Sequence, residues 1–143
     1  IEYLLAIYEL ESEIGHIRTS QLAKKMRVSP STASSALKRL SSLGLLKFER
    51  RRGARLSNKG LELVLEILWR HGVIEEMLFR LGIELDEACE TAYRIQHLIP
   101  LTTLYKISKS LGNPTKCPHG FEITNIEKPA KKRYHICRPI RKP

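Results

Sequence analysis

The chain has 143 residues, of which 28% are charged, and a formal net charge of +10 at pH 7. This length allows one domain or two small ones with a real hydrophobic core. No apolar run approaches the roughly 20 residues that a spanning helix needs, so we expect no membrane partner. No secretory signal is visible after Ile1, and three cysteines cannot all pair within one chain. We therefore expect reduced thiols and a cytoplasmic protein.

The positive charge is clustered. Residues 1–60 contain 12 Lys and Arg against 5 Asp and Glu, residues 61–120 contain 6 against 8, and residues 121–143 contain 7 against 2. Basic N-terminal and C-terminal segments around an acidic central segment favour a polyanion-binding part and a different central part. The alternative is a generally basic protein without such a partner.

The first 46 residues predict three helices. Residues 1–10 are amphipathic and predict a first helix that Gly15 ends, and residues 16–18 form a short extended connector. Two short helices then share residues 19–46. Ser29 is a natural N-cap and Pro30 suits the first helical position, which indicates that the second of them covers 30–43.

The helix over residues 30–43 has one apolar and one polar face. The apolar positions are Ala33, Ala36, Leu37, Leu40 and Leu43. The predicted DNA-binding positions, which are hydroxyl-bearing or basic, are Ser29, Ser31, Thr32, Ser34, Ser35, Lys38 and Arg39. Such a face fits the major groove, where hydroxyls meet phosphates and base edges and cations neutralise phosphate. An ordinary helical hairpin with a soluble face is the alternative.

A hairpin is predicted directly after this helix. Residues 46–48 alternate in polarity, residues 50–53 turn, and residues 54–56 return. Arg50, Arg51 and Arg52 lie at the tip. A basic hairpin after a helix-turn-helix is typical of a winged helix, whose wing contacts phosphates or the minor groove. A solvated charged loop is the alternative.

A long helix follows from about residue 58 to residue 81. Its predicted buried stripe is Leu61, Val64, Leu68, Leu78 and Leu81. His71 and Glu75 interrupt this stripe four residues apart, so their side chains point the same way. Because burial of a carboxylate is costly unless it is paired or binds metal, a metal site is one interpretation. A structural His–Glu pair or a partly exposed helix edge are the others.

Two shorter helices are predicted over residues 84–99 and 101–111, before the loop Cys117-Pro118-His119-Gly120. A tight loop with Cys and His suits a metal ion. The metal-ligating residue types upstream strengthen this interpretation. A simple loop with a buried cysteine is the alternative.

Residues 124–143 form a basic tail, which is either disordered or a second phosphate contact. His135 and Cys137 are not predicted as ligands.

The predicted fold is mostly α, with a winged helix-turn-helix over residues 1–60, a helical domain over 61–123 and a tail over 124–143. No Gly-rich phosphate loop and no nucleophile–base pair is visible at a recognisable spacing. We therefore expect neither an enzyme nor a small organic substrate.

Several motifs together resemble a known family. They are Glu2-Tyr3-Leu4, Ser29-Pro30-Ser31-Thr32, Arg52-Gly53-Ala54-Arg55-Leu56-Ser57-Asn58-Lys59-Gly60, Arg70-His71 with Glu75, and Cys117-Pro118-His119-Gly120. In this order they are similar to the diphtheria-toxin-repressor-like transcription factors, which respond to iron or manganese. The resemblance covers about residues 1–123. It implies an N-terminal winged helix and a helical domain for metal binding and dimerisation.

The resemblance also implies two metal positions. One draws on Glu2 and on a later cluster that here is Tyr93, Gln96 and His97, so Glu2 and His97 form a second metal site or a hydrogen-bonded pair. Gln is a poor transition-metal ligand. The other position uses His71 and Glu75, with Cys89 aligned to the third ligand and Cys117 available as a fourth. Two thiolates favour zinc, with iron or manganese as alternatives.

The sequence thus predicts a homodimeric, metal-dependent transcriptional regulator of the repressor type. It would control genes of metal homeostasis by binding double-stranded DNA at a palindromic operator. One alternative is a winged-helix DNA-binding regulator with a purely structural zinc site. Another is a winged-helix module that binds RNA or protein.

Overall fold

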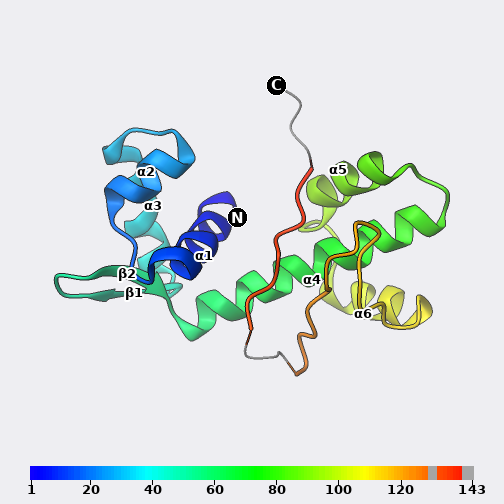
Figure 1. The fold of residues 1–143 in the computed structure, drawn as a ribbon. Coiled ribbons are helices and arrows are strands. Elements are labelled where there is room, and N and C mark those ends of the chain that lie inside the picture. The colour runs from blue at the N-terminus through cyan, green and yellow to red at the C-terminus, as the bar shows by residue number, and fades with distance from the viewer. Residues whose placement is uncertain (129–131, 140–143) are drawn as a thin grey trace. The chain divides into compact units, whose positions relative to one another are not determined.

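A computed structural model of the chain describes residues 1–128 and 132–139. The chain divides into two compact units, Ile1–Val64 and Leu65–Pro143. The helix α4 (Asn58–Arg80) contributes to both of them (Figure 1). The described elements are six helices and one two-stranded hairpin, which confirms the mostly α fold predicted from the sequence.

The first unit begins with three helices, α1 (Glu2–Ile14), α2 (Thr19–Met26) and α3 (Pro30–Ser42). α1 ends at Ile14, directly before the Gly15 that was predicted to end it. The buried apolar side chains of these helices include Leu4, Ile7, Tyr8, Leu22 and Leu37. Removal of one such side chain from water contributes about 1.5–3 kcal/mol, which is why these short helices hold their positions.

The hairpin of β1 (Leu46–Glu49) and β2 (Gly53–Leu56) is antiparallel, with Leu46 opposite Leu56. The connector before α2 adds a third segment, because Ile17 exchanges backbone hydrogen bonds of 2.8 and 2.9 Å with Ala54. Gly53 is required at this crossing. Its φ is +118°, and a Cβ there would lie 2.6 Å from the Ile17 carbonyl oxygen. The predicted wing is therefore anchored to the connector.

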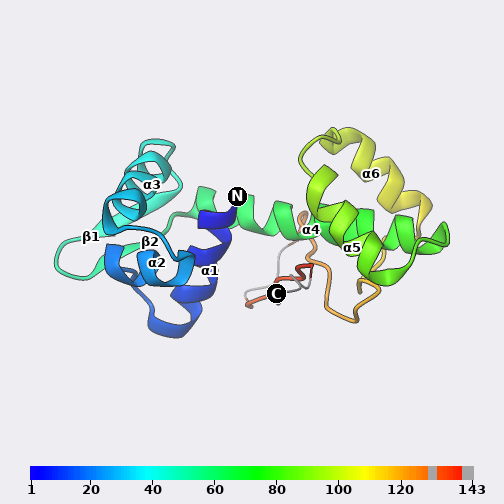
Figure 2. The same ribbon diagram turned by 90° about the horizontal axis from the view of Figure 1, so that it is seen from above.

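The second unit is built on α4, α5 (Leu85–Ile95) and α6 (Leu101–Ser110). α5 and α6 lie against the C-terminal half of α4 (Figure 1, Figure 2). The core of this unit consists of Trp69, Val73, Ile74, Ala92 and Leu104.

Two residues of the stripe that was predicted to be buried on α4 are exposed instead. Leu61 is 39% exposed and Leu81 is 74% exposed, whereas Val64 is fully buried. In the second unit, the buried side chains of α4 include Val73 and Ile74, which share a core with residues of α5 and α6.

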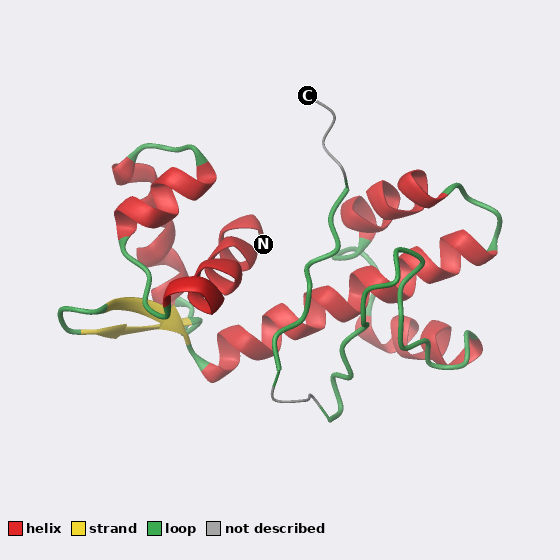
Figure 3. Ribbon diagram, in the orientation of Figure 1, coloured by secondary structure: helices red, strands yellow, loops and turns green. Residues whose placement is uncertain are grey.

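The segments after α6 form loops in the described part of the chain (Figure 3). They are nevertheless part of the second unit. Thr124 donates a hydrogen bond of 2.9 Å from its hydroxyl to the Leu65 carbonyl, and Tyr134 and Ile136 are buried. Residues 132–139, predicted to belong to a basic tail, thus pack as an ordered strap. Residues 129–131 and 140–143 of the predicted tail lie outside the described residues.

No helix among the described residues is both long and apolar enough to cross a membrane.

Candidate metal centre and nucleic-acid interface

α4 brings a histidine and a carboxylate together inside the second unit. His71 Nε2 lies 3.0 Å from Glu75 Oε2, and these side chains are 5% and 0% exposed. Their burial excludes the predicted alternative of a partly exposed helix edge. A fully buried carboxylate is destabilising unless it is paired and hydrogen-bonded, so further partners of Glu75 are expected.

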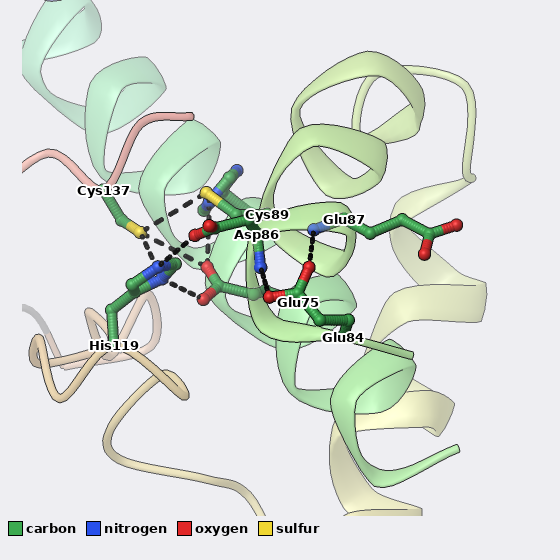
Figure 4. A network of polar contacts seen from close by, with 8 residues as sticks. Glu75, Glu84, Asp86, Glu87, Cys89, His119 and Cys137 are labelled. Atoms are coloured by element: carbon green, nitrogen blue, oxygen red, sulfur yellow. Dashed lines mark hydrogen bonds and ion pairs between the residues drawn. The ribbon is translucent and has the colours of Figure 1, made fainter. Parts of the chain in front are cut away.

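α5 supplies the first thiol. The helix begins where the Glu84 carboxylate accepts hydrogen bonds of 3.3 Å from the backbone N–H groups of Asp86 and Glu87 (Figure 4). One turn later, the small buried Ala88 allows close packing, and Cys89 Sγ lies 3.5 Å from His71 Nε2. The sequence placed Cys89 beside this histidine, and the structure brings the two together.

The loop after α6 supplies a second histidine and a second thiol. A turn closes it, because Gly120 donates a backbone hydrogen bond of 2.8 Å to the Cys117 carbonyl and Cys117 donates one of 2.9 Å to Phe121. His119 Nδ1 then lies 2.6 Å from Glu75 Oε1. The loop was predicted to suit a metal, but His119 was not selected as a ligand.

The third thiol comes from the strap. Cys137 Sγ lies 3.3 Å from Glu75 Oε2, 3.5 Å from His119 Nδ1 and 3.8 Å from Cys89 Sγ (Figure 4). The sequence prediction set Cys137 aside together with His135, whereas the structure brings the Cys137 thiol into the cluster. His135 itself is exposed and stacks on Phe121 with the rings 3.9 Å apart. The one sequence signal for Cys137 was that a third cysteine remained unassigned.

The donor atoms form two groups, each with all atoms within 4.8 Å of one another. One contains His71, Glu75, Cys89 and Cys137, and the other contains Glu75, Cys117, His119 and Cys137. The predicted set of His71, Glu75, Cys89 and Cys117 is therefore rearranged. Cys137 takes the fourth place beside the first three residues, and Cys117 falls into the second group.

Protonation in this cluster favours thiolates. Burial opposes the charged form of His71, but hydrogen bonds to Cys89 and Glu75 outweigh it and raise the pKa of His71 to about 9. The hydrogen bond from Cys137 lowers the pKa of Cys89 to about 6, and a second one does the same for Cys117. The pKa of Cys137 is raised because its proton is held between those two sulfur atoms. The lowered pKa values make Cys89 and Cys117 the more readily ionised thiols of the cluster.

The spacing of the sulfur and nitrogen donors fits a tetrahedral metal ion, whereas the Glu75 oxygens lie at hydrogen-bond distance from both histidines. With Zn–S of about 2.3 Å and Zn–N of about 2.0–2.1 Å, neighbouring sulfur atoms lie about 3.8 Å apart, and neighbouring nitrogen and sulfur atoms lie about 3.5 Å apart. The Cys89–Cys137 distance is 3.8 Å, and the Cys89–His71 and Cys137–His119 distances are both 3.5 Å. Thiolate and imidazole donors suit zinc and iron(II) better than manganese.

In the first unit, α3 presents the predicted polar face. Ser29 caps the helix as expected, because its Oγ accepts a hydrogen bond of 3.2 Å from the Thr32 N–H. The same Oγ lies 3.0 Å from Ser31 Oγ and 2.8 Å from Thr32 Oγ1, so three hydroxyls cluster at the N-terminus. Of the remaining predicted positions, Ser35, Lys38 and Arg39 are exposed, and Ser34 is half-buried.

The wing carries exposed arginines at its turn. Arg50 and Arg51 are exposed, and Arg51 adopts a left-handed φ of 68°. Arg52 differs from them because its Nη1 lies 3.7 Å from Glu49 Oε2. Arg50 and Arg51 are thus exposed cations of the turn, whereas Arg52 lies beside Glu49. Contact of the predicted α3 and wing residues with DNA remains a prediction.

Comparison with known families matches both units. Residues 2–54 match the N-terminal DNA-binding domain of the iron-dependent repressors, and residues 57–125 match their metal-binding and dimerisation domain. The chain belongs to the iron-dependent repressor family. This confirms the resemblance drawn from the sequence motifs. Cys137 lies beyond the segment that the family model matches.

Individual members of the iron-dependent repressor family support this assignment. An HTH-type transcriptional regulator of Aeropyrum pernix is 32% identical over 121 residues, which cover 83% of this chain and 67% of that protein. The iron-dependent repressor IdeR of Mycobacterium leprae is 28% identical over 87% of this chain, which spans only 54% of IdeR. The crystal structure of the hypothetical protein SSo2273 from Sulfolobus solfataricus has a TM-score of 0.80 and 31% identity, over 86% of this chain and 95% of that one.

The second metal position implied by the family resemblance stays a prediction. Glu2 is the first residue of α1 in the first unit, and His97 is an exposed residue just after α5 in the second unit. Gln96, beside it, is buried.

Proposed function

We propose that this iron-dependent-repressor-family protein is a metal-dependent repressor that binds double-stranded DNA as a homodimer. The observation that carries the proposal is the pairing of a winged helix-turn-helix with a buried group of thiol, imidazole and carboxylate donors in one chain. The family domain that matches the second unit is one of metal binding and dimerisation. Exposed apolar side chains at Leu81 and Leu98, both at least 70% exposed, supply surface that a second copy would cover.

The primary ion in this proposal is held by His71, Glu75, Cys89 and Cys137. These residues come from α4, α5 and the strap, so an ion would join three segments that are far apart in the sequence. Two thiolates favour zinc or iron(II) over manganese. The cysteines are free thiols, which is consistent with action in the reducing cytoplasm.

Regulation requires that the metal-bound form have a higher affinity for DNA than the metal-free form. In a homodimer with two-fold symmetry, each α3 would enter a major groove of one half-site. The operator would then be palindromic, with half-sites roughly 34–36 Å apart or at a multiple of that distance. Arg50 and Arg51 of each wing would contact the phosphate backbone.

Fluorescence anisotropy tests the proposal. The chain is titrated onto labelled DNA from upstream of its own gene, at fixed salt, first with chelator and then with zinc, iron(II) or manganese(II). A tenfold rise in affinity with one metal corresponds to a coupling of about 1.4 kcal/mol and supports a metal sensor. Equal affinity for single-stranded RNA at the same salt would instead indicate an RNA-binding module.

A second candidate is a DNA-binding regulator whose metal is purely structural. It is favoured by the fact that all members of both donor groups lie in the second unit, where an ion would tie the loop and the strap to α4. High DNA affinity that does not change when metal is removed and restored would select this candidate.

A further inference from the structure

The six donors of the second unit are more than one ion can use. Resting on the metal-binding role proposed above, we propose that this unit holds two metal ions. The first occupies the group of His71 and Cys89, the second is held by Cys117 and His119, and Glu75 and Cys137 bridge both ions. Two properties of the cluster support this assignment: the donor distances and the orientation of the two shared side chains.

Distances separate the donors into two sites. Two sulfur ligands of one ion lie at most about 4.6 Å apart, because each Zn–S bond is about 2.3 Å long. The donor atoms of the cluster form two groups of four within 4.8 Å, and no single group contains all six residues. One ion therefore leaves either the His71 and Cys89 pair or the Cys117 and His119 pair without metal.

Glu75 is oriented as a bridging carboxylate. Its Oε2 lies 3.0 Å from His71 Nε2, and its Oε1 lies 2.6 Å from His119 Nδ1. Each oxygen thus faces the histidine of a different group. The carboxylate is fully buried, so each of its oxygen atoms needs a hydrogen-bond donor or a cation as a partner.

Cys137 is the second bridging residue, through its sulfur atom. Its Sγ lies 3.8 Å from Cys89 Sγ in one group and 3.5 Å from His119 Nδ1 in the other. It belongs to both groups, as Glu75 does. Both distances match edges of a tetrahedral site, of about 3.8 and 3.5 Å, so one thiolate can complete both coordination shells.

The charge of the cluster is compatible with two ions. Three thiolates and one carboxylate carry four negative charges, which two divalent cations neutralise. Thiolate-rich donors select thiophilic ions such as zinc, iron(II) or the spectroscopic probe cobalt(II).

Cobalt(II) titration of the full chain under reducing conditions tests the inference. Thiolate-to-cobalt absorption reports binding, and mass spectrometry under native conditions counts the ions. We expect two cobalt ions in the wild-type chain and one in Cys117→Ser and in His119→Gln, with circular dichroism confirming that each variant is folded. His135→Ala is the matched control, because this histidine lies two residues from Cys137 but is exposed and outside both groups. It should keep two ions.

Electron paramagnetic resonance tests the bridge itself. Shared thiolate and carboxylate ligands couple the two cobalt ions, so the signal per ion should be weaker in the wild-type chain than in His119→Gln. One ion in the wild-type chain overturns the inference, and so do two ions in both Cys117→Ser and His119→Gln. Loss of the second ion in His97→Ala would place it at the predicted Glu2 and His97 position and would also overturn it.

Failure of this inference is distinguishable from failure of the proposed function. One bound ion with metal-dependent DNA affinity refutes the second ion and supports the metal-dependent repressor. Two bound ions with DNA affinity that is independent of metal support the two-ion cluster and refute the metal sensor.

Discussion

Gly72 lies on α4 close to Ile123, which follows the ligand-bearing loop, and its substitution gives a sharp test of this packing. A Cβ at Gly72 would lie 2.7, 3.0 and 3.3 Å from Cγ1, Cδ1 and Cγ2 of Ile123. Gly72 directly follows His71 in α4, and Ile123 follows the loop that carries Cys117 and His119. Substitution to alanine would therefore push this loop away from Glu75.

Two opposing terms set the magnitude. Overpacking of this kind costs about 1–3 kcal/mol. Replacement of glycine by alanine inside a helix stabilises by about 0.5–1 kcal/mol. Gly72→Ala alone should thus lower the free energy of unfolding by up to about 2 kcal/mol. In an Ile123→Ala background all three nearby atoms are gone, so the same substitution should become stabilising by about 0.5–1 kcal/mol.

Urea unfolding of the metal-free chain, followed by circular dichroism, measures all four members of this cycle. The matched control is an Ile126→Ala background, because this isoleucine packs in the same unit without being among the nearest atoms to Gly72. There Gly72→Ala should remain destabilising. If its effect agrees within about 0.5 kcal/mol in the wild-type and Ile123→Ala backgrounds, the contact does not constrain the loop and the reasoning is refuted.

Three further outcomes are expected. Ser29→Ala should cost about 1 kcal/mol in urea unfolding because the Thr32 N–H loses its cap, and Ser29→Asp should retain it; an equal loss in both would contradict the cap. Arg50→Ala and Arg51→Ala should each reduce the slope of log affinity against log salt by about 0.9 for every phosphate that the arginine neutralises, and an unchanged slope would remove the wing from the interface. Zinc binding at neutral pH should release protons from His71, whose pKa is about 9, as well as from a thiol. Calorimetry in buffers of different ionisation enthalpy measures this release, which should be smaller for His71→Gln than for the wild-type chain.

Local sequence patterns predicted most of the DNA-binding unit, although Leu43, predicted to lie on the buried face of α3, is 52% exposed. The start of α3 follows from Ser29 and Pro30, and its end is within one residue of the prediction. Its polar face is exposed as predicted, because a helix of known phase and a short hairpin depend on neighbours in the sequence. The start of α4 and the pairing of His71 with Glu75 were predictable for the same reason, since both residues lie one turn apart on one helix.

The metal centre depends on contacts that no local pattern contains. Cys137 lies 62 residues from Glu75 in the chain, and His119 lies 44 residues from it. Neither segment has helical or strand periodicity, so its direction is set only by packing such as that of Ile123 on Gly72 and of Tyr134 and Ile136 in the second unit. The exposure of Leu81 follows from the same cause, because the choice of the buried face of α4 is made by α5 and α6. The sequence by itself determined the helices, the wing and the chemical types of the donors, and the tertiary structure decided which donors meet, because convergence of distant segments is a property of the packed core.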